Sequence, residues 1–345
     1  MWRKCLDPIT NWLKTNTLVL LTLGNAQLPL SKRFKNKSIV ALAGGVGGAK
    51  MILGLASVLD PADLTCVVNV GDDEVFHGLN VSPDLDTVMY TLGGSIDTSK
   101  GWGLANESYQ TLNSLNVLGE ETWFNLGDKD LATHLVRTRM LREGHKLTQV
   151  TQHLCSRLGV KVRVLPVSDD KISTILHGPE GVLSMQEYFV KHRCEPAISD
   201  VEYVQDNAVI TPEVVQSISA ADAIIICPSN PVLSIGPMLA IKQMSELLSQ
   251  NRSKTVVVSP LIGSEAVSGP AGYLMNQLGM ESNVLGLARF YQGLCTGVVI
   301  DESDGLHEVS LVKLGLSVMM LPIMMRTKSD KQVLAQSVLE AIFNE

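Results

Sequence analysis

Five carboxylates lie within fifteen residues early in the chain: Asp72, Asp73, Glu74, Asp84 and Asp86. Like charges crowded into one crevice repel one another, and a hard cation relieves that repulsion. Mg²⁺ suits this role, since it is commonly held by one or two carboxylates together with oxygens of a substrate phosphate. The spacing therefore predicts a magnesium site, with a solvated acidic loop as the alternative. Asp84 taken alone is typical of a structural residue in the first turn of a helix.

A glycine-rich run, Gly44-Gly45-Val46-Gly47-Gly48-Ala49-Lys50, follows the first apolar segment. Glycines in such a turn let a phosphate approach the backbone, and the N-terminus of the following helix supplies amide donors. The run fits neither standard fingerprint, because the dinucleotide pattern requires Gly or Ala where Lys50 stands and the Walker pattern requires Gly where Ala49 stands. We predict a phosphate-binding turn of another kind; a tight strand-to-helix turn that glycine merely permits is the alternative.

A second polar cluster contains Asp130, His134 and Arg137, which share one face of an expected helix at spacing i, i+4, i+7. On this face His134 could position a hydroxyl or a phosphate, and an ordinary ion-paired helix face is the alternative. Further along, Pro228-Ser229-Asn230-Pro231 and residues 259–263 place hydroxyl, amide and glycine groups at strand ends. Such groups suit a nucleotide or a phosphate, and they equally suit ordinary connecting loops.

The elements that must position these groups follow from hydrophobic patterning. Short apolar runs typical of buried parallel strands alternate with helical patterns, which indicates βαβ units. A strand, a helix and a second strand are expected at 38–43, 50–59 and 64–70, and two strand–helix pairs at 223–227 with 238–249 and at 255–259 with 270–278. In a wound parallel sheet the carboxyl ends of the strands open into the ligand crevice. Asp72 and Asp73 fall just past such an end.

The middle of the chain follows another pattern. Residues 130–158 predict two helices, opened by Asp130 and by Thr148, and short strands are expected around 160–165 and 172–177. We therefore predict an α/β fold: a Rossmann-like, doubly wound, mainly parallel sheet with a helical insert at about 100–160. This domain is expected to span 38–325, followed by a C-terminal helix at 326–345.

Composition excludes several classes of protein. The chain has 345 residues and a net charge of −7, and 45% of its residues are hydrophobic, which supports a sizeable core. Residues 1–38 carry seven basic and one acidic side chain, so the remainder holds 21 bases against 34 acids and has a net charge of −13. Such an acidic body argues against a nucleic-acid surface. Six scattered cysteines without a CxxC pair indicate reduced thiols and a cytoplasmic protein.

Residues 1–37 are expected to be a poorly ordered, basic N-terminal extension. A signal or transit peptide is the alternative for its short apolar stretch at 17–23. No segment has the length and continuity of a membrane span, because the longest charge-free run, 223–241, contains three prolines. We predict no membrane partner.

Taken together, the motifs resemble those of the 2-phospho-L-lactate transferase (CofD) family of coenzyme F-420 biosynthesis. The matching segments run in family order over roughly residues 38–320. They include the glycine run, Asn69–Asp73, SPDLDTVMY at 82–90, Trp102-Gly103, LGDKDLATHLVR at 126–137, PVSD at 166–169 and PSNPVLSIGP at 228–237. The resemblance implies a Mg²⁺-dependent homodimer. It would transfer a phosphorylated C3 acid from a guanosine diphosphate conjugate to the deazaflavin Fo, giving coenzyme F-420-0 or its dehydro form and releasing GMP.

The resemblance also implies roles for particular residues. Asp72 and Asp86 would hold the metal, Trp102 and His134 would help to seat the deazaflavin, and Asp73 or His134 could accept the proton of the attacking hydroxyl. The residues expected to meet the nucleotide and diphosphate are Gly44, Gly45, Gly47, Gly48, Lys50, Asn69, Ser229, Asn230 and Ser234.

Two rival interpretations belong to other classes. A regulator related to the gluconeogenesis-factor family would bind nucleotide-sugars without catalysis, but such regulators differ where SPDLDTVMY and LGDKDLATH stand here. An NAD-dependent oxidoreductase is the second rival, but the glycine run does not match the dinucleotide-binding fingerprint that such an enzyme requires. The sequence does not distinguish phospholactate, phosphoenolpyruvate and phosphoglycerate as the acid that is transferred.

Overall fold

A parallel sheet of seven strands forms the centre of the protein, as a computed structural model describes it for residues 34–267 and 269–343. All neighbouring strands in this sheet pair in parallel, and β1 lies between β2 and β9, with Ile39 opposite both Leu64 and Ala223. The strand order is β14(Ser317–Met320)-β13(Gly297–Ile300)-β10(Thr255–Val258)-β9(Ala223–Ile226)-β1(Ile39–Ala43)-β2(Leu64–Val68)-β5(Arg163–Pro166). The predicted doubly wound α/β fold is confirmed.

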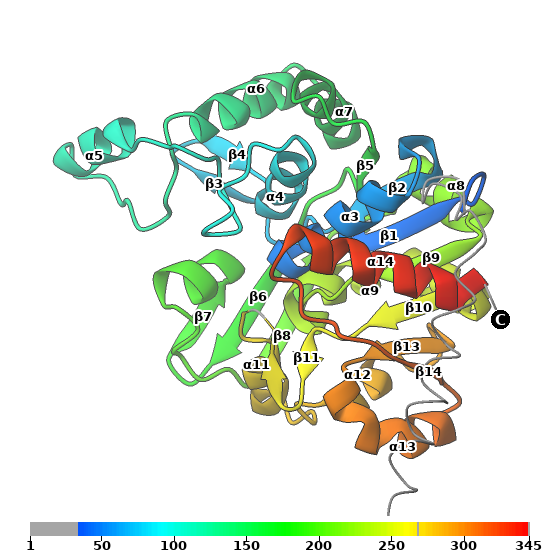
Figure 1. Cartoon of the computed structure of the whole chain (residues 1–345). Coiled ribbons are helices and arrows are strands. Elements are labelled where there is room, and N and C mark those ends of the chain that lie inside the picture. The colour runs from blue at the N-terminus through cyan, green and yellow to red at the C-terminus, as the bar shows by residue number, and fades with distance from the viewer. Residues whose placement is uncertain (1–33, 268, 344–345) are drawn as a thin grey trace, which may run out of the picture.

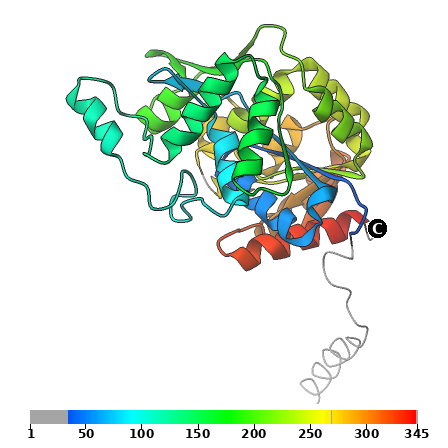
Figure 2. The same cartoon turned by 90° about the horizontal axis from the view of Figure 1, so that it is seen from above.

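The strand order reverses between β1 and β9. From β1 the chain proceeds to β2 and β5 on one side, and from β9 it proceeds to β10, β13 and β14 on the other. Helix α3 (Gly45–Val58) follows β1 and lies beside α14 (Lys328–Phe343) on one face of the sheet, while α8 (Pro212–Ala220) and α10 (Lys242–Gln250) cover the opposite face (Figures 1 and 2). At such a reversal the two crossovers diverge and leave a crevice at the carboxyl ends of the strands.

Two insertions extend from the sheet. The first lies between β2 and β5, and the second, between β5 and β9, is a three-stranded antiparallel sheet in the order β7-β6-β8 (Figure 1). The first contains β3 (Glu74–Phe76), β4 (Leu79–Val81), α4 (Pro83–Leu92), α5 (Gln110–Val117), α6 (Asp130–Arg142) and α7 (Leu147–Arg157), and the second contains β6 (Ile172–Gly178), β7 (Gly181–Ser184), the π-helical turn η2 (Glu187–Lys191) and β8 (Asp200–Gln205). Of the second insertion, the sequence analysis predicted only the strand at 172–177.

The remaining elements connect the parallel strands. They are η1 (Pro61–Asp63), η3 (Pro231–Ile235), α9 (Gly236–Ala240), η4 (Arg252–Lys254), β11 (Leu261–Ile262), β12 (Glu265–Ala266), α11 (Ala271–Gln277), α12 (Val284–Phe290), η5 (Glu302–His307) and α13 (Glu308–Lys313).

Two predicted helix boundaries are wrong for identifiable reasons. Helix α3 begins at Gly45 rather than at residue 50, because most of the glycine run is itself the first turn. The helix expected at 238–249 is split at Ile241, whose extended backbone (φ −70°, ψ 107°) separates α9 from α10.

The two ends of the described chain meet. The ring of Phe34 lies 6.3 Å from that of Phe343 in α14, and Phe34 is buried in the main core. Residues 34–37, which we had assigned to the extension, therefore begin the folded domain, while residues 1–33 lie outside the described part. The predicted C-terminal helix corresponds to α14. Within residues 34–343, apart from position 268, no helix is long and apolar enough to cross a membrane.

The contact between α3 and α14 depends on Gly54. A Cβ atom at this position would lie 2.2 Å from the backbone oxygen of Lys331 and 3.2 Å from the Cβ of Ala335. We expect Gly54→Ala to lower the free energy of unfolding by about 1–3 kcal/mol through overpacking, although alanine is the better helix former. Chemical denaturation measures this loss. Val333→Ala, at an exposed position of α14, is the control, and an equal effect of the two changes would contradict the packing argument.

Candidate active site

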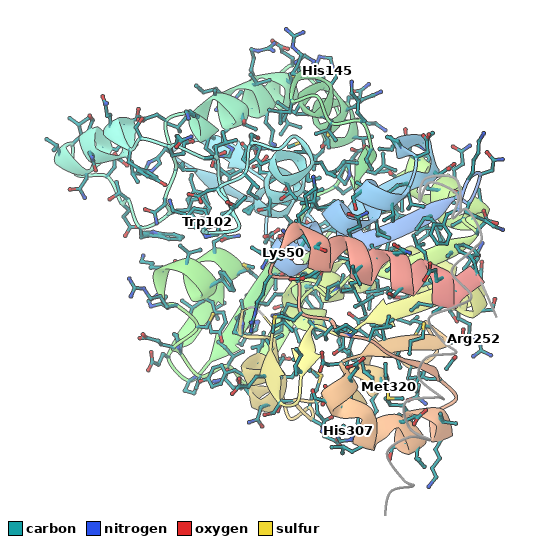
Figure 3. All side chains as sticks on the ribbon, in the orientation of Figure 1. Lys50, Trp102, His145, Arg252, His307 and Met320 are labelled. Carbon is teal, nitrogen blue, oxygen red and sulfur yellow. The ribbon has the colours of Figure 1, made fainter. Side chains whose placement is uncertain are left out.

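A cavity of about 550 Å³ opens at the carboxyl ends of β1 and β9, where the two insertions face the parallel sheet. The sequence-predicted residues that line it are Gly44, Gly45, Gly47, Lys50, Asp72, Asp86, Trp102, His134, Ser229, Asn230 and Ser234. Figure 3 shows Lys50 and Trp102 on this side of the molecule, with Trp102 between the first insertion and the ribbon of the second. Gly48, Asn69 and Asp73, which were also predicted, are not among the lining residues. The structure thus brings most of the predicted site together.

The glycine turn is packed tightly against the loop that follows β9. The hydroxyl of Ser229 accepts a hydrogen bond from the amide of Gly44 (3.1 Å) and donates one to its carbonyl (2.8 Å). A Cβ at Gly47 would lie 2.2 Å from the carbonyl oxygen of Pro228. Gly45 has a φ of +63°, which favours glycine, and its amide donates to Asp84 Oδ1 (2.5 Å). Close packing thus explains these glycines, and their contact with a phosphate stays a prediction.

The carboxylates of the acidic loop are buried around the start of α3 and α4. Burial raises the pKa of Asp72 well above its usual range, and the nearby charges of Asp84 and Asp73 raise it further. Burial also raises the pKa of Asp84 to about 6, against the lowering effect of hydrogen bonds from Asn69 and Gly45. Glu74 faces away from this group and accepts a hydrogen bond from Ser184 (3.1 Å).

This arrangement fits a bound cation. The side-chain donors near the Asp72 carboxylate, among the described residues, are amides: Asn69 Nδ2 lies 3.4 Å from Oδ1 and Gln186 Nε2 lies 3.5 Å from Oδ2. No lysine, arginine or histidine in the described residues forms an ion pair with Asp72. Buried negative charge without a basic partner is costly, and a divalent ion removes that cost. The residues present therefore suit a hard cation bound through oxygen atoms.

Asp86 lies at the opposite side of the acidic group and has a different environment. Arg137 on α6 binds both of its carboxylate oxygens, and the His134 Nε2 atom lies 3.3 Å from Asp130 Oδ2. The predicted shared face of α6 is confirmed. One ligand atom from each of Asp86, Asp130 and His134 lies within 4.8 Å of the others, so these three residues could hold a metal ion.

Aromatic side chains line the outer part of the cavity. Trp102 and Phe189 are 41% and 40% exposed, and both line the cavity together with Phe124 and Met185. The ammonium group of Lys100 lies 5.3 Å from the centre of the Trp102 ring. Exposed aromatic faces at a cavity entrance suit a flat heterocyclic ligand.

Comparison with known proteins identifies the family. A family profile described as "2-phospho-L-lactate transferase CofD" matches residues 39–313. The chain belongs to the CofD family. A 2-phospho-L-lactate transferase of Methanosarcina mazei is 37% identical over 305 residues, covering 88% of this chain and 100% of the relative. A phosphoenolpyruvate transferase of Streptomyces griseus is 40% identical over 309 residues, covering 88% and 97%.

The fold of this CofD protein also resembles that of a solved structure. A UPF0052 family member from Bacillus halodurans superposes with a TM-score of 0.58 over 88% of this chain and 99% of the other, at 16% sequence identity. At that identity the likeness concerns the fold alone.

Sequence reasoning missed two residues at this candidate site and left the roles of two others incomplete. Asp84 was treated as structural, although it lines the cavity and binds the first amide of α3. Arg137 was placed on the correct helix face, but nothing in its spacing indicated Asp86 as its partner. Gln186 and Phe189 carried no sequence signal, because the antiparallel insertion brings them to the cavity from more than 100 residues away.

The two predicted metal ligands should differ in their effect on stability. Because the pKa of Asp72 is raised in the folded protein, its ionisation opposes folding as pH rises above the unfolded-state pKa. We expect Asp72→Asn to unfold at the same temperature as the wild type or higher in metal-free buffer at pH 7. Asp86→Asn removes the charge that balances buried Arg137, and should cost about 3–5 kcal/mol.

Thermal and urea unfolding with a chelator present would measure both effects. Asp301→Asn, a change at a more exposed cap outside the cavity, controls for loss of any carboxylate. Equal destabilisation by Asp72→Asn and Asp86→Asn would contradict the charge assignment.

Proposed function

We propose that this CofD protein transfers a phosphorylated C3 acid from its guanosine diphosphate conjugate to the ribityl hydroxyl of the deazaflavin Fo, with release of GMP. The proposal is carried by one observation: a single cavity joins the glycine turn, unbalanced buried carboxylates and exposed aromatic faces. The relatives' names, 2-phospho-L-lactate transferase and phosphoenolpyruvate transferase, support the class of group transferred. A homodimer and a cytoplasmic location stay predictions.

Each part of the cavity is assigned a portion of the substrates. The glycine turn with Lys50, and the loop containing Ser229, Asn230 and Ser234, would bind the guanosine diphosphate portion. Trp102 would hold the deazaflavin ring by stacking. Asp72 would hold Mg²⁺ together with Asp86, whose carboxylate oxygens have lone pairs beyond those used by Arg137. When bound, Mg²⁺ supplies charge neutralisation of the diphosphate and of the leaving GMP.

In the transfer, the ribityl oxygen forms a bond to the phosphorus that bears the acid, and the bond from that phosphorus to the GMP oxygen breaks. The hydroxyl proton must pass to a base. Asp73 and His134 were the predicted acceptors, but Asp73 is not among the residues that line the cavity. His134 Nδ1 faces a donor, Arg137 Nη1, at 3.2 Å. We therefore propose Asp84, which lines the cavity, as the acceptor.

A direct assay tests the function. The protein is incubated with Fo, MgCl₂ and, separately, the guanosine diphosphate conjugates of phospholactate, phosphoenolpyruvate and phosphoglycerate. We expect mass spectrometry to detect a phosphodiester of Fo and an equal amount of GMP with one preferred donor, and no product when Mg²⁺ is chelated. Asp72→Asn, which should remain folded, serves as the inactive control.

Folded protein that converts none of the three conjugates would overturn the proposal. Binding of nucleotide-sugars by that same inactive protein, measured by calorimetry, would favour the regulatory alternative. The preferred donor in a successful assay identifies the acid.

A further inference from the structure

Arg137 is an arginine enclosed by the protein on all sides. Its side chain is 1% exposed and lies at the interface of α6 with α4 and β4. Nη1 donates to Asp86 Oδ2 (3.1 Å) and to the carbonyl of Asn80 (3.4 Å), and Nη2 donates to Asp86 Oδ1. This two-pronged contact fixes the plane of the Asp86 carboxylate, because the rigid guanidinium matches both oxygens at once.

The same guanidinium determines how His134 uses its ring. Arg137 Nη1 lies 3.2 Å from His134 Nδ1. A guanidinium only donates hydrogen bonds. A hydrogen bond between these two atoms, one of three contacts that share the two N–H groups of Nη1, therefore requires Nδ1 to be the unprotonated acceptor. The ring proton is then on Nε2, which is fully buried, 3.3 Å from Asp130 Oδ2 and without a well-aligned acceptor in the described part of the chain. Asp130 in turn accepts a hydrogen bond from the Tyr90 hydroxyl (2.5 Å).

These contacts bear on the metal-binding capacity of the group Asp86, Asp130 and His134. Two carboxylates and an imidazole are a ligand set that favours zinc, cobalt or manganese over magnesium. An ion bound through Asp86 Oδ2 and His134 Nδ1 would lie beside the Arg137 guanidinium, which contacts both atoms. Repulsion between the two cations in this buried place opposes such binding.

We propose that Arg137 is a positioning residue that takes the place of a metal ion in the group Asp86, Asp130 and His134. It thereby directs divalent cations to the oxygen ligands on the cavity side and excludes transition metals from His134 Nδ1. This inference rests on the proposed function for the identity of the cavity cation, Mg²⁺. Under this inference His134 does not accept the substrate proton. Its ring instead contacts Arg137, which orients Asp86.

Cobalt titration of Arg137 variants tests the proposal. We expect Arg137→Gln to bind one more equivalent of Co²⁺ than the wild type, with the stronger visible absorption of a nitrogen-ligated, low-coordinate site. The further change His134→Asn should abolish this gain. Arg139→Gln, on the same helix but exposed and paired with Glu143 (2.8 Å), is the matched control and should bind Co²⁺ as the wild type does.

The variant Arg137→Lys separates the effect of the positive charge from that of the planar guanidinium. Its ammonium group should still exclude the additional Co²⁺, but it lacks the fork that orients Asp86. We therefore expect calorimetry to show a Mg²⁺ Kd raised by about 10–100-fold, the usual effect of losing a residue that orients a metal ligand. Unchanged Mg²⁺ affinity in Arg137→Lys, or no Co²⁺ gain in folded Arg137→Gln, would overturn the proposal.

A measurement on the wild-type protein covers the case in which Arg137→Gln does not fold. Nitrogen-15 NMR of labelled histidine at neutral pH should report His134 Nδ1 as unprotonated and Nε2 as protonated, with no change when Mg²⁺ is added. A doubly protonated ring, or a Mg²⁺-dependent shift of either nitrogen, would contradict the assignment. Neither the metal titration nor the NMR measurement requires turnover. A failure of this inference can therefore be distinguished from a failure of the proposed transferase function.

Discussion

The site depends first on the close approach of two strand ends. The carboxyl ends of β1 and β9 lie side by side where the sheet changes direction, and the Ser229 hydroxyl joins them through both the amide and the carbonyl of Gly44. This contact requires glycine, because a Cβ at Gly44 would lie 2.4 Å from Asp84 Oδ2. The glycine run is thus as much a packing device as a ligand-binding one, and it brings α3, the acidic loop and the β9 loop around one cavity.

The second constraint is electrostatic. Asp72, Asp84 and Asp86 are all buried within the same region. Asp86 forms an ion pair with Arg137 and also lies 3.7 Å from His134 Nδ1. Folding therefore encloses more acidic groups than basic groups at this place, and burial raises the pKa of Asp72 and Asp84. Binding of a cation would offset the free-energy cost of burying these carboxylates and would thereby stabilise the folded domain. The same carboxylates would thus affect both the proposed cation binding and the stability of the domain.

Much of this architecture was predictable from the sequence. The buried strands were predictable because each is a short, continuous apolar run. The shared face of α6 was predictable because helical spacing determines that Asp130, His134 and Arg137 lie on the same side of the helix. Local patterns could not reveal the antiparallel insertion. Its strand β8 alternates exposed and half-buried residues, and its pairing with β6 is specified by contacts between distant segments. Gln186 and Phe189 were missed for the same reason, since their place in the cavity is a property of the tertiary fold.

The position of Gln186 has a consequence for the order of events at the cavity. Its side-chain amide donates to the backbone carbonyl of Asp72 (3.1 Å), and three residues later in the same turn Phe189 lines the outer cavity. A ligand that displaces this turn by pressing on Phe189 also displaces the amide that restrains Asp72. Ligand binding at the aromatic side chains and cation binding at the carboxylates would then be thermodynamically coupled, and such coupling would be reciprocal: each ligand would change the affinity for the other by the same factor.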